Sequence, residues 1–288
     1  YDVFQKIYES SPNLLVWVGN TAHLRKSDID SKSGYLKRYT ESRKQIIPKT
    51  LFSEIPNLSI WSHYDYGISN NGKEMSLKNQ AQEAFSAFWP KTSLIKHQNT
   101  LCYNHKISDI ELFFLDVKSE SKLDLLNRKN VMLGYEQMNW LKSSLKNSSA
   151  KFKLIISGAP MLNPIKSKYN FSFFEDEKIE LLEFLNNEKI EGVFFISGGS
   201  YSGELTRIKH SSYYSLYDLT LGPVTANPIV EKKDLNYYRV PGTKTIERQF
   251  TILEFLGSEE NRRLRLIISD LTGTKIWSKI ININELYY

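Results

Sequence analysis

Residues 60–67 have the sequence IWSHYDYG, the stretch most informative about the fold. A short apolar approach at residues 56–60 has the length of a buried strand, and His63 and Asp65 follow it among aromatic side chains. Imidazole and carboxylate are common metal ligands in proteins. The stretch is therefore a working metal site, the remnant of one, or a turn rich in tyrosine, and the sequence around it is needed to choose.

Apolar runs and amphipathic stretches alternate on both sides of this segment, as in proteins built from α/β layers. The predicted strands lie at residues 14–18, 58–61, 110–116, 152–157 and 192–197. The predicted helices lie at residues 36–46, 76–90, 135–145 and 176–187. After them come three β-rich runs, FTILEFLG, RLRLIISD and KIWSKIIN, which predict an antiparallel meander over about residues 245–288. No linker separates it, so we expect a single α/β domain over residues 1–288.

Composition excludes several classes of function. The 38 Lys and Arg residues are scattered among 32 Asp and Glu residues, whereas a nucleic-acid surface concentrates its positive charge. We therefore expect no nucleic-acid partner. No apolar run approaches the roughly 20 residues of a membrane span, so no transmembrane segment is expected. Cys102 is the single cysteine, which excludes an internal disulfide and a cysteine-based zinc site.

The order of motifs resembles the PhoD-like (alkaline phosphatase D) family, a branch of the calcineurin-like metallophosphatases. The resemblance runs through LLVWVGN, SDIDSKSGYLKRYTESR, IWSHYDYG, FFLDVK, LGYEQMNWLKSSLKNSSAKFKLIISGAPMLNP, GVFFISGG, GELTRIKH and LYDLTLGPVT. It implies an α/β/β/α fold, in which two facing mixed sheets are flanked by helices. It also implies metal ligands on loops at the strand ends.

Three of those loops depart from the family pattern. Where the family has Gly-Asp, Trp-Asp-Asp-His-Asp-Tyr-Gly and Ser-Gly-Asp-Arg-His, this chain has GN at 19–20, WSHYDYG at 61–67 and SGGSY at 197–201. The positions that the resemblance assigns to the former active site are Asn20, Ser62, His63, Tyr64, Asp65, Asp116, Lys118, Gly199 and Tyr201. Lys118 and Ser200 stand where the family has arginines. The scaffold residues Trp61, Asp65, Tyr66, Gly67, Asp116, Gly198 and Glu204 match the family.

These changes remove negative charge from the implied site. Two divalent ions about 4 Å apart repel each other by roughly 16 kcal/mol at an effective dielectric constant of about 20, so their ligands must supply anions. Asn20, Ser62 and Gly199 are neutral, and a tyrosine phenol loses its proton only near pH 10. We therefore expect no catalytic residues and no cofactor, and interpret the chain as a pseudophosphatase.

Two alternatives to a pseudophosphatase stay open, a phosphoesterase with a remodelled metal site and a purely structural subunit. His23, His63, Asp65, Asp116 and Glu204 could converge on one remodelled site for a single Zn, Fe, Mn or Ca ion, giving a phosphomonoesterase or phosphodiesterase. The simpler expectation is that His63 packs near Trp61 and Tyr66 and that the two aspartates cap loop amides. The third hypothesis is a purely structural subunit.

Two further segments have ordinary explanations. GGSYSG at 198–203 resembles a phosphate loop or a nucleophile elbow but lacks the required spacing, so a turn is expected. HSSYYSLYDL at 210–219 predicts half-buried tyrosines on an edge strand, although exposed tyrosines also anchor interfaces.

The expected role is thus binding of protein partners in a larger assembly, with a glycan or a phosphorylated ligand as further options. Members of the family that the chain resembles are usually exported, so the resemblance implies an extracytoplasmic location, periplasmic or at the cell surface. Any membrane association is expected only through partners or through an N-terminal anchor.

Overall fold

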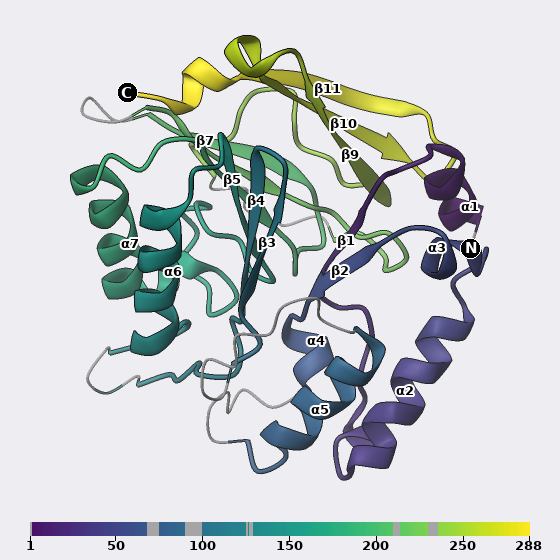
Figure 1. The fold of residues 1–288 in the computed structure, drawn as a ribbon. Coiled ribbons are helices and arrows are strands. Elements are labelled where there is room, and N and C mark those ends of the chain that lie inside the picture. Colours follow the sequence, from purple (N-terminus) through teal and green to yellow (C-terminus); the bar gives the residue numbers. More distant parts are fainter. Residues whose placement is uncertain are drawn as a thin grey trace.

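The structure is a computed structural model that describes residues 2–67, 75–89, 100–124, 126, 129–209, 214–229 and 236–288. Strands and helices alternate through its first two thirds, and a three-stranded meander follows (Figure 1). No helix within the described ranges is long and apolar enough to cross a membrane. Residues 210–213 of the predicted tyrosine strand lie outside the described residues.

The larger sheet has six strands in the order β3-β4-β5-β6-β8-β7. They are β3 (Tyr103–Ile107), β4 (Ile110–Leu115), β5 (Phe152–Ser157), β6 (Val193–Ser197), β7 (Glu204–Ile208) and β8 (Leu216–Thr220). Strands β4, β5, β6 and β8 are parallel, and β3 and β7 are antiparallel edges. Because β8 lies inside the sheet, the expected edge-strand tyrosine Tyr217 is fully buried rather than half-buried.

The crossover helices α6 (Tyr135–Asn147) and α7 (Glu175–Asn187) lie together on one side of this sheet (Figure 1). Both were predicted from their apolar spacing. Leu141 and Leu145 of α6 and Leu181 and Leu185 of α7 are buried, which places one apolar stripe of each helix against the sheet.

The second layer consists of two shorter sheets. Strands β1 (Leu15–Val18) and β2 (Asn57–Ile60) are parallel, and β9 (Gln249–Leu256), β10 (Arg263–Asp270) and β11 (Lys275–Asn282) form the predicted antiparallel meander. A small core that includes Phe4, Leu51 and Phe250 joins β1 to β9 by side-chain packing. The expected two facing layers are confirmed, although the second layer is divided into two ladders.

Five further helices and four 3₁₀ turns complete the described secondary structure. They are α1 (Asp2–Glu9), α2 (Lys32–Lys44), α3 (Thr50–Ser53), α4 (His63–Tyr66) and α5 (Lys78–Phe88), with 3₁₀ turns η1 (Lys26–Asp28), η3 (Phe171–Phe173), η4 (Glu259–Asn261) and η5 (Ile283–Leu286). Helix α2 starts four residues before the predicted position because the Ser31 hydroxyl accepts a hydrogen bond from the Gly34 amide. In α5, Ala81, Ala84 and Phe85 form the predicted buried stripe.

Candidate functional site

The candidate site lies where loops leave the carboxyl ends of β1, β2, β4, β5 and β6. Glycines let four of these loops touch. A Cβ added at Gly19 would lie 2.3 Å from Ser62 Cβ, and one at Gly199 would lie 2.3 Å from the Gly158 carbonyl oxygen. Gly19 and Gly199 both have a positive φ, at 80° and 69°, which an L side chain rarely adopts. The loops after β1, β2, β5 and β6 therefore meet backbone to backbone.

Gly199 offers a direct test of this close packing. We expect Gly199→Asp, which restores the carboxylate of the family pattern, to lower the free energy of unfolding by about 2 kcal/mol because of its positive φ and the contact with Gly158. Urea denaturation measures this change. Gly242→Asp is the control, since Gly242 has a φ of 77° but nothing lies within 4 Å of its added Cβ. Equal losses for the two variants would show that φ alone, and not loop packing, sets the cost.

The neutral residues Asn20, Ser62 and Ser200 form hydrogen bonds to backbone groups of these loops. Asn20 Oδ1 accepts a hydrogen bond of 3.0 Å from the Tyr64 amide. The buried Ser62 hydroxyl donates to the Gly158 carbonyl at 2.6 Å. Ser200 in the GGSYSG segment donates to the Ser202 carbonyl at 2.8 Å, as expected for a local turn. These side chains hold the loops together.

Five aromatic side chains lie together beside these loops, and we call this cluster of His23, His63, Tyr64, Tyr169 and Tyr201 the aromatic mouth. The ring of His23 stacks on Tyr64 at a centroid distance of 4.0 Å, and the Tyr201 hydroxyl donates to the Tyr64 hydroxyl at 3.2 Å. Burial and the Tyr64 hydroxyl raise the pKa of Tyr201 to about 12. Its phenol is therefore protonated at neutral pH and is a poor metal ligand.

His63 lies among aromatic rings and positive charge. Its ring is edge-on to Tyr64 and Tyr169, each at 5.2 Å, while the expected neighbours Trp61 and Tyr66 contact each other at 5.0 Å. Its Nδ1 lies 3.4 Å from the Lys118 ammonium.

Burial and nearby charges lower the pKa values of His63 and Lys118. Burial, with Lys118 and Lys168 nearby, lowers the pKa of His63 to about 4. Burial lowers the pKa of Lys118 to about 8, although Asp116 opposes the shift. The imidazole is therefore neutral at pH 7 and sits beside an ammonium group. A positive charge there repels a metal ion.

Asp65 is a loop-capping carboxylate. It is fully buried and accepts hydrogen bonds from the Thr21 hydroxyl at 2.8 Å, the Ala22 amide at 2.8 Å and the Ser62 amide at 2.9 Å. Burial raises the pKa of Asp65 to about 6, against the lowering effect of these donors. The carboxylate ties the loop after β1 to the start of α4.

Asp116 has the same kind of role at the end of β4. Its carboxylate accepts hydrogen bonds from Trp61 Nε1 at 2.6 Å, the Leu101 amide at 2.8 Å and the Ser119 hydroxyl at 2.6 Å. The amides of residues 118 and 119 also donate to it, at 3.0 and 2.9 Å. Both aspartates thus bind loop amides, as expected.

Glu204, at the start of β7, belongs to a third network. Its carboxylate accepts from Arg239 Nε at 2.7 Å and from the amide groups of Asn163 and Asn236 at 2.7 and 2.8 Å. Lys244 lies 3.7 Å away. The charge of this glutamate is therefore compensated by the side chains around it.

The residues present do not fit paired divalent cations. Across the described part of the chain, no three His, Cys, Asp or Glu side chains are grouped so that they could hold a metal ion. His23, His63, Asp65, Asp116 and Glu204 are divided between the aromatic mouth and three separate carboxylate networks. No reaction step through metal ions can be derived from this donor set.

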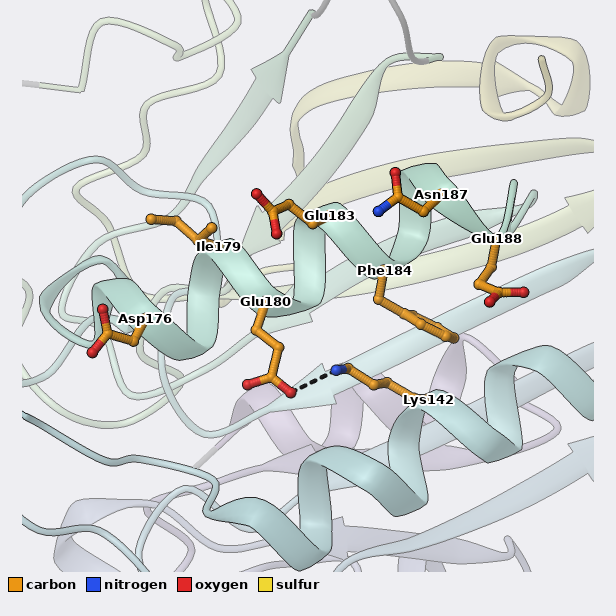
Figure 2. Close-up of a pocket in the computed structure, with 8 residues that line it drawn as sticks. All are labelled: Lys142, Asp176, Ile179, Glu180, Glu183, Phe184, Asn187 and Glu188. Atoms are coloured by element: carbon orange, nitrogen blue, oxygen red, sulfur yellow. Dashed lines mark hydrogen bonds and ion pairs between the residues drawn. The ribbon is translucent and has the colours of Figure 1, made fainter.

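Two grooves occur elsewhere on the described surface, and no candidate site residue lines either. The first has a volume of about 470 Å³ and lies over α6 and α7, where Lys142 reaches Glu180 at 2.5 Å (Figure 2). Its other carboxylates are Asp176, Glu183 and Glu188. The second groove lies at the end of α2.

Two sheet layers with loops converging at the strand ends define the metallophosphatase fold. Residues 6–251 match the family described as PhoD-like phosphatase, and the chain belongs to that family. A solved structure of PhoD is similar with a TM-score of 0.69 and 13% identity, over 97% of this chain and 69% of that one. The purple acid phosphatase PPD1 from yellow lupin (Lupinus luteus) seeds is similar with a TM-score of 0.67 and 11% identity, over 98% of this chain and 48% of that one. Among curated proteins, no sequence matches the chain.

Proposed function

We propose that this member of the PhoD-like phosphatase family is a pseudophosphatase that serves as a binding or scaffold subunit of a protein assembly. The observation that carries the proposal is the use of the loop side chains. Asn20 and Ser62 form hydrogen bonds within the loops, and a side chain at Gly199 would collide with the Gly158 carbonyl. The charged group that lies 3.4 Å from the His63 ring is the Lys118 ammonium. Anions that would offset the repulsion between two divalent ions are missing from this set.

The same mouth suits binding without catalysis. Tyr64 belongs to α4, Tyr169 and Tyr201 come from two different loops, and Tyr169 is 46% exposed. Tyrosines present an apolar face with a polar tip and often anchor protein interfaces. A protein partner or the face of a sugar ring would stack on these side chains. An extracytoplasmic location is part of the same proposal and rests on the family resemblance.

Metal content and turnover test the proposal. We expect purified chain, incubated with Zn, Fe, Mn or Ca and then desalted, to retain far less than one ion per chain. We also expect bis-p-nitrophenyl phosphate and p-nitrophenyl phosphate to be hydrolysed no faster than by a His63→Gln variant. Inductively coupled plasma mass spectrometry and absorbance assays measure these two quantities.

The alternative of a remodelled phosphoesterase predicts a different pattern. A stoichiometric ion together with turnover that disappears in His63→Gln would establish that alternative. Turnover that persists unchanged in the variant indicates a contaminating phosphatase, and the proposal then stands on the metal content.

A further inference from the structure

The groove at the end of α2 has a volume of about 410 Å³ and lies between α2, α3 and the end of α5. Its lining includes Arg43, Phe52, Glu54, Ile55, Phe88 and Trp89. The groove therefore combines aromatic walls with one cation and one carboxylate, and it is separate from the aromatic mouth.

Arg43 is the unusual group in this groove. Its guanidinium carbon lies 3.8 Å from the centre of the Phe52 ring and 4.4 Å from that of Trp89. Of its five N–H donors, one is used within the described residues, by Nη2 to the Phe88 carbonyl at 2.8 Å. Arg43 forms no ion pair within the described residues, and burial lowers its pKa to about 10. A partly buried guanidinium packed against two tilted rings thus keeps donors for an acceptor from outside.

Trp89 gives a second, independent indication. It is 5% exposed, and its Nε1 has no hydrogen-bond partner among the described residues. Buried N–H groups are nearly always paired, because an unmatched donor loses its hydration without compensation. Two residues that line one groove therefore both have unmatched donors.

The remaining walls set the class of ligand. The guanidinium fork matches the two oxygens of a carboxylate. Phe52, Ile55 and Phe88 supply apolar contact for whatever carries that carboxylate. Glu54 also lines the groove, where it accepts a hydrogen bond from the Tyr8 hydroxyl at 2.6 Å. Its charge disfavours a dianionic phosphate more than a carboxylate, which has a single charge.

We propose that this groove binds a carboxylate carried on an apolar or aromatic body, with Arg43 as the anion-binding residue. Small aryl or alkyl acids and the C-terminal residue of a peptide share this chemistry. The groove acts in this way whether or not the chain hydrolyses phosphoesters.

Isothermal titration calorimetry with N-acetyl-phenylalanine tests the assignment. We expect the acid to bind and its amide, N-acetyl-phenylalaninamide, to bind at least about tenfold more weakly, because the amide cannot form a charge-assisted pair with the guanidinium. Arg43→Met is expected to weaken binding of the acid by at least about tenfold as well. Arg43→Lys, which keeps the charge without the fork, should give an intermediate Kd. Lys44→Met is the matched control, since Lys44 is exposed on the same helix, and it should leave the Kd unchanged.

The source of the carboxylate is distinguished by a pentapeptide that ends in phenylalanine. Binding of the free-acid peptide at least about tenfold tighter than that of N-acetyl-phenylalanine indicates a peptide C-terminus, and equal binding indicates a small acid. Equal binding of acid and amide, or absence of binding at millimolar acid, would overturn the proposal. If circular dichroism shows that Arg43→Met does not fold, the comparison of Arg43→Lys with wild type decides the case, and an unchanged Kd would overturn it.

Discussion

Replacing Asp116 by alanine is expected to lower the free energy of unfolding by about 4 kcal/mol, the largest effect of any single substitution proposed for this chain. The carboxylate is fully buried and receives hydrogen bonds from Trp61 Nε1, the Leu101 amide and the Ser119 hydroxyl. Each buried donor left without a partner costs about 1 to 3 kcal/mol, less what relaxation and entering water recover. The change would release the loop before β3 from the loop after β4.

Urea denaturation at pH 7 measures the change, and Asp176→Ala is the matched control. Asp176 is exposed in the first turn of α7, so its loss should alter the free energy of unfolding by no more than about 0.5 kcal/mol. If Asp116 were a metal ligand and not a scaffold residue, its replacement would have a different effect on stability. Its removal would leave stability nearly unchanged or increased, and a loss below about 1 kcal/mol for Asp116→Ala would contradict a scaffold role.

Periodic patterns predicted the elements that depend on local sequence. The apolar runs of β4, β5 and β6 and the buried stripes of α5, α6 and α7 have one dominant period each, and all six elements occur where expected. Helix α1 was missed although Val3, Phe4, Ile7 and Tyr8 lie on one packed face, because its 8 residues give a pattern of only about two turns. The position of β8 between β6 and β7 was also missed, because the order of strands in a sheet depends on long-range pairing.

In the candidate site, too, local sequence predicted some features, and those that depend on long-range contacts were missed. Asp116 follows β4 directly and Asp65 lies in the first turn of α4, so their capping of loop amides was predictable from position. Lys168 and Tyr169 reach His63 from a loop about a hundred residues further along the chain, and no local pattern marks them. Arg43 resembles a surface residue of a lysine-rich helix until its packing against Phe52 and Trp89 is known. Such contacts depend on tertiary packing and have no signature in a single sequence.

The second large effect is a dependence of stability on pH that comes from His63. The folded-state pKa of this histidine is lowered to about 4 by burial and by Lys118, whereas an unfolded chain has an ordinary value near 6.5. Between these two values the unfolded chain binds a proton that the folded chain does not. The stability contributed by the neutral imidazole is therefore complete above about pH 6.5 and is lost as the pH falls toward 4, by about 1.4 kcal/mol per pH unit.

Asp65 opposes this loss in the wild-type chain. Burial raises its folded-state pKa to about 6 from an ordinary 3.8, so the folded chain retains a proton that the unfolded chain releases. Its contribution to stability increases as the pH falls from 6 toward 3.8. Over about pH 4 to 6 the contributions of His63 and Asp65 to the slope of stability with pH therefore have opposite signs and offset each other.

The His63→Gln variant separates the two effects, since Asp65 cancels in the difference between variant and wild type. We expect the variant to gain about 2 kcal/mol relative to wild type when the pH is lowered from 7.5 to 4.5, as measured by urea denaturation at each pH. Lys118→Met should reduce the wild-type loss in part, because Lys118 is the first charge that lowers the pKa of His63. Parallel stability curves for His63→Gln and wild type would mean that His63 titrates alike in the folded and unfolded chains. In that case the imidazole is solvated at the mouth, the ammonium at 3.4 Å does not control its charge, and a metal ligand at this position becomes chemically reasonable again.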